Sequence, residues 1–148
     1  MLIPLTRRTS KILVVDDEPP VCLFIEKGLR AAGFNNLLFS HNGSNVPNKA
    51  LSERPDLIIM DVMMPGGNGM KALRILRSTP ATARIPVIIT SGFNVPTVGD
   101  CDLSRPDRVL AKPFTVDQLL RAVGALLPMT GNTQAVATFP ADLKAVPA

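Results

Sequence analysis

The chain has no tryptophan and no tyrosine, and it has only two cysteines among 148 residues. It therefore lacks two of the side chains that stack on bases, and no predicted helix carries a basic stripe, so we do not expect nucleic-acid binding. Cys22 and Cys101 are too few for a disulfide framework and do not have the spacing of a zinc site. No apolar run approaches the roughly 18 residues that a membrane span requires, so no membrane segment is predicted.

The net charge of +4 indicates no particular partner. Arg7 and Arg8 supply two of the positive charges, and between Ser10 and Leu127 there are 13 basic and 11 acidic residues, a surplus of only two. The arginines follow a short apolar start, which is the wrong order for a secretory signal. Hydrophobic residues make up 46% of the chain, which is enough to bury the core of one domain. We therefore expect a reduced, cytoplasmic protein with one folded domain.

Short apolar runs alternate with helical segments along most of the chain. Runs rich in β-branched residues indicate buried strands, and apolar residues at helical spacing indicate helices. Ser44 is predicted to cap the second helix, with Pro47 in its first turn. Thr115 and Gln118 form a capping-box pattern at the start of the last helix. The predicted strands are 11–16, 36–40, 56–61, 85–91 and 109–112, and the predicted helices are 20–32, 44–53, 70–78 and 115–127.

Five strands alternating with helices predict an α/β fold, a parallel sheet with helices on both faces. The glycine-rich segment 63–69 is predicted to be a loop. The segment 93–107 stands where a crossover helix belongs, but its prolines and glycine make it a poor helix former. We expect residues 10–127 to form the domain, with a flexible arm over 1–9 and a flexible tail over 128–148.

Chemically active side chains stand at the carboxyl ends of the predicted strands, where such sheets carry their sites. The first strand ends in Asp16 and Asp17 and the third ends in Asp61, while Thr90 and Lys112 stand at the ends of the fourth and fifth. Clustered carboxylates repel one another, and a hard cation such as Mg²⁺ relieves that repulsion. A carboxylate oxygen of Asp61 could then attack phosphorus and form an acyl phosphate.

These landmarks, taken in order, resemble the receiver domain of response regulators in two-component signalling. The resemblance covers the chain from about Lys11 to Leu127. It implies a flavodoxin-like, doubly wound five-stranded parallel sheet with strand order 2-1-3-4-5. The matching stretches are VVDDE at 14–18, PDLIIMDVMMPGGNG at 55–69, PVIITSG at 86–92 and KPF at 112–114.

The resemblance also assigns the metal site and the phosphoacceptor. Asp61 is implied to accept the phosphoryl group, and Mg²⁺ is the implied cofactor. The implied metal ligands are Asp16, Asp17 as the more direct of the two, Asp61 and the backbone carbonyl of Met63.

Thr90 is implied to be the switch hydroxyl and Lys112 the amine that pairs with the phosphate, with a cis bond between Lys112 and Pro113. Two positions depart from the family pattern. Val109 stands where an aromatic residue is common, and Gly92 leaves no side chain two positions past Thr90. These departures put the usual aromatic relay in doubt. A long-lived phosphoryl group is also expected, because neither Met63 nor Gly92 offers a polar side chain that could position a water molecule for hydrolysis.

The implied function is that of a signalling protein and not an enzyme, beyond catalysis of its own phosphorylation and dephosphorylation. The phosphoryl group would come from a sensor histidine kinase or a histidine phosphotransfer protein, and phosphorylation would switch binding of a downstream protein target. One alternative is a receiver fragment of a hybrid histidine kinase. An aspartate-based phosphohydrolase is disfavoured because the first strand lacks a DxD motif. A DNA-binding factor is disfavoured because the residues after Leu127 are too few for a helix-turn-helix unit.

Several residues near these landmarks have plainer predicted roles. Met60, Met63 and Met64 are predicted to fill gaps in the core, as methionine does well. His41, the single histidine, is predicted to be a surface residue in a turn. Cys22 is predicted to pack under the first helix.

Overall fold

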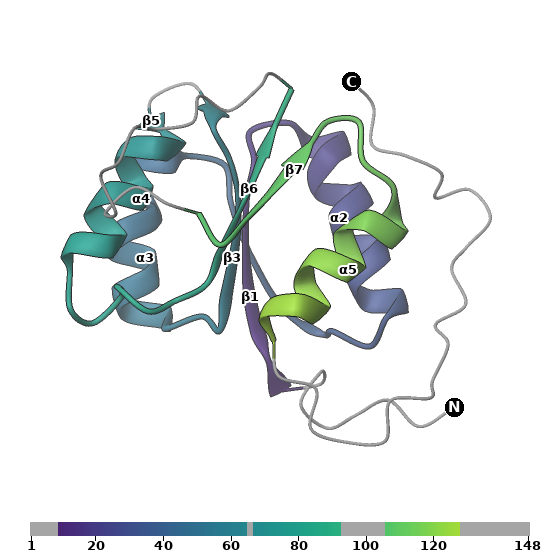
Figure 1. Ribbon diagram of the computed structural model, residues 1–148, viewed down its shortest axis with the longest axis horizontal. Coiled ribbons are helices and arrows are strands. Elements are labelled where there is room, and N and C mark those ends of the chain that lie inside the picture. The colour runs from purple at the N-terminus through teal and green to yellow at the C-terminus, as the bar shows by residue number, and fades with distance from the viewer. Residues whose placement is uncertain (1–8, 65–66, 93–105, 128–148) are drawn as a thin grey trace.

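The computed structural model describes residues 9–64, 67–92 and 106–127. Within these ranges, five parallel strands form one sheet in the order β2-β1-β3-β6-β7 (Figure 1). Since β6 and β7 are the fourth and fifth strands of this sheet, the predicted order is confirmed. The strands are β1 (Lys11–Val15), β2 (Asn36–Ser40), β3 (Leu57–Asp61), β6 (Val87–Ser91) and β7 (Arg108–Ala111).

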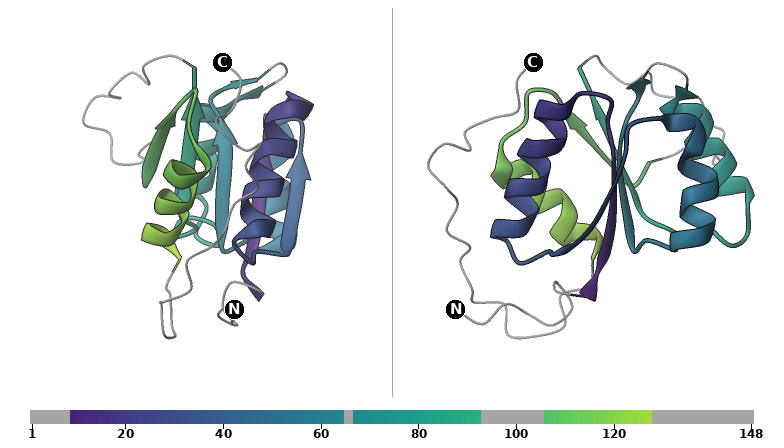
Figure 2. Two further views of the ribbon diagram at one scale, coloured as in Figure 1. Left: turned by 90° about the vertical axis from the view of Figure 1, so that its right-hand side faces the viewer. Right: turned by 180° about the vertical axis from the view of Figure 1, so that it is seen from behind.

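Helices cover both faces of the sheet, as the alternating pattern predicts. Helices α2 and α5 lie side by side on one face, and α3 and α4 lie on the other (Figures 1 and 2). Strand β1 contributes to both cores, with Ile12 and Val14 facing α2 and α5 while Leu13 and Val15 face α3 and α4. The helices are α2 (Pro19–Ala31), α3 (Val46–Glu53), α4 (Gly69–Ser78) and α5 (Val116–Leu126).

The start of α3 differs from its prediction. The side chain of Asn42 accepts hydrogen bonds from the backbone N–H and the hydroxyl of Ser44, so a 3₁₀ turn, η1 (Gly43–Asn45), precedes the α-helix. Asn45 occupies the N-cap position and makes no capping side-chain hydrogen bond. The prediction that Ser44 caps this helix was wrong, because Ser44 lies inside the 3₁₀ turn, which Asn42 caps, and α3 begins only at Val46.

The predicted loop after the third strand is a small hairpin. Strands β4 (Met63–Met64) and β5 (Gly67–Asn68) pair antiparallel, and the backbone N–H of Gly69 then donates to the Val62 carbonyl at 3.0 Å. Strands of two residues are too short to show an alternating pattern, so the sequence could not reveal them. The hairpin leads the chain from the end of β3 directly into α4.

Other boundaries lie within two residues of the predictions. The Thr115 and Gln118 side chains form the predicted capping box at the start of α5. The predictions for 93–107 and for the two ends of the chain fall almost entirely outside the described residues, and so does Cys101. Among the helices of the described ranges, none has the length and apolar character needed to cross a membrane.

Candidate functional site

Three aspartates meet at the carboxyl edge of the sheet. Strands β1 and β3 are neighbours, with Val15 paired to Met60, so the residues that follow them lie side by side. One carboxylate oxygen from each of Asp16, Asp17 and Asp61 lies within 4.8 Å of the others. Asp16 and Asp61 are only 1% and 5% exposed. The predicted convergence of these acids is therefore present in the structure.

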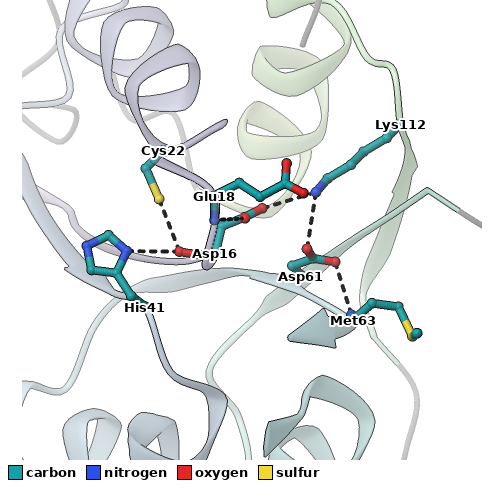
Figure 3. A network of polar contacts seen from close by, with 7 residues as sticks. All are labelled: Asp16, Glu18, Cys22, His41, Asp61, Met63 and Lys112. Atoms are coloured by element: carbon teal, nitrogen blue, oxygen red, sulfur yellow. Dashed lines mark hydrogen bonds and ion pairs between the residues drawn. The ribbon is translucent and has the colours of Figure 1, made fainter. Parts of the chain in front are cut away.

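Lys112 reaches the same cluster from the end of β7. Its Nζ lies 3.1 Å from Asp16 Oδ2 and 3.1 Å from Asp61 Oδ2, as the close view in Figure 3 shows. Strand β6 separates β7 from β3, so the long lysine side chain spans the end of one intervening strand. The peptide bond between Lys112 and Pro113 is cis, as the resemblance implies.

Burial and neighbouring charges shift the pKa values of Asp16 and Lys112 in opposite directions. Burial raises the pKa of Asp16, and the Glu18 backbone N–H and Lys112 partly offset that effect. Burial alone would lower the pKa of Lys112, but the charges of Asp16 and Asp61 outweigh it and raise the pKa. With all four groups ionised, three carboxylates and one ammonium leave two negative charges. A divalent cation with oxygen ligands matches both that charge and the donor set.

Thr90 lies beside Asp61 in the sheet. The two residues are partners in the parallel register of β3 and β6, and paired residues direct their side chains to the same face. The Val62 backbone N–H donates to the Thr90 carbonyl at 3.1 Å and extends this pairing past the strand end. Thr90 is 1% exposed, so its side chain is buried at the same edge of the sheet as Asp61.

Met63 orients the Asp61 carboxylate through its backbone. Its N–H donates to Asp61 Oδ1 at 3.1 Å (Figure 3). Its side chain is 63% exposed, so the prediction that it packs in the core was wrong, whereas Met60 and Met64 are buried as predicted. The alternation of the short strand β4 explains the difference, because Met64 faces inward and Met63 therefore faces outward.

Two residues near the site have contacts that their sequence positions did not indicate. His41 is exposed, but its ring Nδ1 lies 3.0 Å from the Asp16 carbonyl oxygen. Cys22 is buried as predicted, and its Sγ donates to the same oxygen at 3.3 Å. His41 reaches Asp16 because β2 pairs with β1, with Ser40 opposite Val15. No local pattern in the sequence marks this contact.

Mg²⁺ is expected to raise the thermal unfolding temperature, since a cation that binds only the folded acid cluster stabilises the folded state. At a concentration about 100 times the Kd, the gain in free energy of unfolding is about 2.7 kcal/mol. Differential scanning calorimetry with MgCl₂ and with matched NaCl measures the shift. Asp17→Asn, which removes one half-buried carboxylate of this cluster, should lose most of the shift. An equal shift in both proteins would contradict a metal site at these residues.

The doubly wound sheet, with acids and a lysine gathered at its carboxyl edge, defines a receiver domain. The chain belongs to the response regulator receiver domain family, whose model matches residues 12–124. The resemblance drawn from the sequence motifs is confirmed.

Similar proteins differ in how much of their own length this chain covers. The chain is 34% identical over 119 residues to the protein PilH of Pseudomonas aeruginosa, covering 80% of this chain and 98% of PilH. It is 35% identical over 120 residues to the response regulator MprA of Mycobacterium avium, covering 81% of this chain but 52% of MprA. The chain thus spans about half the length of several of the relatives it matches.

Solved structures show the same fold. The chemotaxis response regulator CheY4 of Vibrio cholerae matches with a TM-score of 0.71 and 25% identity, covering 80% of this chain and 98% of CheY4. The receiver domain of the sensor histidine kinase PA1611 of Pseudomonas aeruginosa matches with a TM-score of 0.71 and 28% identity, over 80% of this chain and 97% of that one. That PA1611 structure contains a magnesium ion in its active site cleft.

Proposed function

We propose that this receiver accepts a phosphoryl group on Asp61 in a Mg²⁺-dependent reaction. The donor is the phosphohistidine of a sensor histidine kinase or a histidine phosphotransfer protein, and the phosphorylated form binds a downstream protein target. One observation carries this proposal: the buried Asp61 carboxylate lies 3.1 Å from Lys112 Nζ and beside the two acids that follow β1. This arrangement supports the proposal because it suits the nucleophile, the compensating cation and the metal ligands that the reaction requires.

The contacts of Asp61 suit an in-line attack on phosphorus. The Met63 N–H holds Oδ1 and Lys112 holds Oδ2, so the carboxylate has a fixed direction before the donor arrives. In the reaction an oxygen–phosphorus bond forms and the phosphorus–nitrogen bond of the donor breaks, and the imidazole leaves with its electron pair. Lys112 and the Thr90 hydroxyl would then donate to the phosphoryl oxygens and stabilise their charge.

The metal would neutralise the phosphoryl oxygens when bound. The residues that would hold it are Asp16, Asp17, Asp61 and the backbone carbonyl of Met63. The donor set fits Mg²⁺, because carboxylate and carbonyl oxygens are the ligands that this ion prefers.

The proposed function is tested by incubation with acetyl phosphate. In the presence of MgCl₂ the intact mass should increase by one phosphoryl group, and borohydride reduction followed by peptide mapping should locate it at Asp61. The same sample with EDTA should stay unlabelled. Steady release of product from small phosphomonoesters, with no stable adduct, would instead favour the aspartate-based phosphohydrolase.

The lifetime of the phosphoryl group is expected to shorten when position 92 gains a polar side chain that can hold a water. Gly92 is exposed, and a Cβ there would meet no atom of the described residues within 4 Å, so Gly92→Gln and Gly92→Glu should fold normally. Phosphate release after removal of acetyl phosphate measures the decay. Gly124→Gln, at another open glycine remote from the site, serves as the control. The explanation fails if neither variant at position 92 decays faster than this control.

A further inference from the structure

We propose that His41 and Cys22 are positioning residues for the metal site, because both hold the backbone carbonyl that joins Asp16 to Asp17. The contacts come from two elements, since His41 follows β2 and Cys22 lies in the first turns of α2. Figure 3 shows the imidazole and the thiol converging on this one oxygen. The inference rests on the proposed metal site and adds the residues that keep its ligands in place.

The Asp16 carbonyl belongs to the peptide unit between two proposed ligands. A peptide unit is planar, so fixing the direction of its C=O fixes the rotation of the chain on both sides of it. Asp16 is held at its other polar atoms as well, by the Ser40 carbonyl, the Glu18 N–H and Lys112. Asp17 is half-buried, and the backbone that leads to it sets the direction of its carboxylate. The contacts of His41 and Cys22 with the Asp16 carbonyl should therefore affect the orientation of the Asp17 carboxylate more than that of Asp16.

Both side chains can donate to this oxygen. A carbonyl oxygen only accepts, so His41 Nδ1 carries a proton in this contact whether the ring is neutral or charged. Burial, with the charges of Asp16 and Asp17, raises the pKa of the Cys22 thiol to about 11, so the sulfur keeps its proton at neutral pH. Two donors from separate elements restrict the rotation of the peptide unit more than either does alone.

A role in packing alone does not explain His41. His41 is an exposed residue, so it adds little to the hydrophobic core on either face of the sheet. Its described contact is polar and is made to the backbone of a proposed metal ligand. Removing the ring should therefore change metal binding more than it changes the stability of the fold.

The test compares Mg²⁺ affinity, measured by isothermal titration calorimetry on the metal-free full chain, across paired variants. His41→Ala and Cys22→Ala remove one donor each and should weaken binding about three- to tenfold, the effect of one lost hydrogen bond. His41→Asn and Cys22→Ser keep a donor near the same place and should bind closer to wild type. Leu23→Ala, at an exposed side chain next to Cys22, is the control and should bind as wild type does.

The outcomes separate this inference from the proposed function. Wild-type protein that binds no Mg²⁺ would overturn the metal site itself, and the inference with it. Wild-type binding with unchanged affinity in both alanine variants would overturn the positioning role alone. An equal loss of Mg²⁺ affinity in His41→Asn and His41→Ala would also overturn the positioning role alone. Because Cys22 is buried, urea unfolding of every metal-free variant accompanies the titration, and the His41 pair decides the question if Cys22→Ala is unfolded.

Discussion

Asp61→Asn is expected to abolish labelling by acetyl phosphate. The amide nitrogen that replaces one carboxylate oxygen has no available electron pair for attack on phosphorus, and the amide oxygen is far less nucleophilic than a carboxylate. The shape of the side chain is kept, and the amide oxygen still accepts from the Met63 N–H. Lys112 keeps its second partner, Asp16, so the variant should remain folded.

Asp117→Asn is the matched control for this experiment. Asp117 lies on α5 with a side chain that is 62% exposed, and its ion pair with Arg121 is also exposed. Such a pair contributes little to stability, so labelling and folding should match the wild type. Labelling of Asp61→Asn at the wild-type rate would show that another residue is the phosphoacceptor.

Gly69→Ala is expected to destabilise the protein by about 1–3 kcal/mol. A Cβ at position 69 would lie 2.4 Å from the Asp61 carbonyl oxygen and 2.9 Å from the Val62 Cα, and both atoms belong to the backbone. No rotamer change can relieve such contacts, so the chain must move away from the end of β3. The hydrogen bond from the Gly69 N–H to the Val62 carbonyl would then weaken.

The displacement should also reduce labelling, because the same backbone carries the Asp61 carboxylate. Urea unfolding and the acetyl phosphate assay measure the two effects on one sample. Gly124→Ala provides a control of opposite sign. In the part of the chain that the structure describes, a Cβ there meets nothing within 4 Å, and alanine in a helix is favoured over glycine by up to about 1 kcal/mol. Equal stability of Gly69→Ala and wild type would show that the close approach is not required.

The sequence by itself determined the fold class and the place of the site. Apolar runs of strand length alternate with helical periodicity, and both patterns depend on neighbouring residues only. The capping box of Thr115 and Gln118 is local in the same way, and the structure confirms it. Parallel strands share one carboxyl edge, so the sequence alone predicts that Asp16, Asp61 and Lys112 meet there.

The sequence did not predict the local structure of two short segments, the start of α3 and the hairpin of β4 and β5. Ser44 has the right residue type to cap a helix, but Asn42 caps a 3₁₀ turn that contains Ser44 and precedes the helix. The hairpin of β4 and β5 is too short to leave a pattern. In both cases the deciding interactions span only a few residues, and several local arrangements are close enough in energy that the surrounding packing selects one.

Only the tertiary structure decided the contacts between distant residues. Lys112 bridges Asp16 and Asp61 because β7 lies two strands from β3, and His41 reaches the Asp16 carbonyl because β2 is the neighbour of β1. Position 69 has no room for a Cβ, because α4 begins against the backbone at the end of β3. These distances depend on strand order and register across the sheet, which the packing of the whole domain fixes and no local segment encodes.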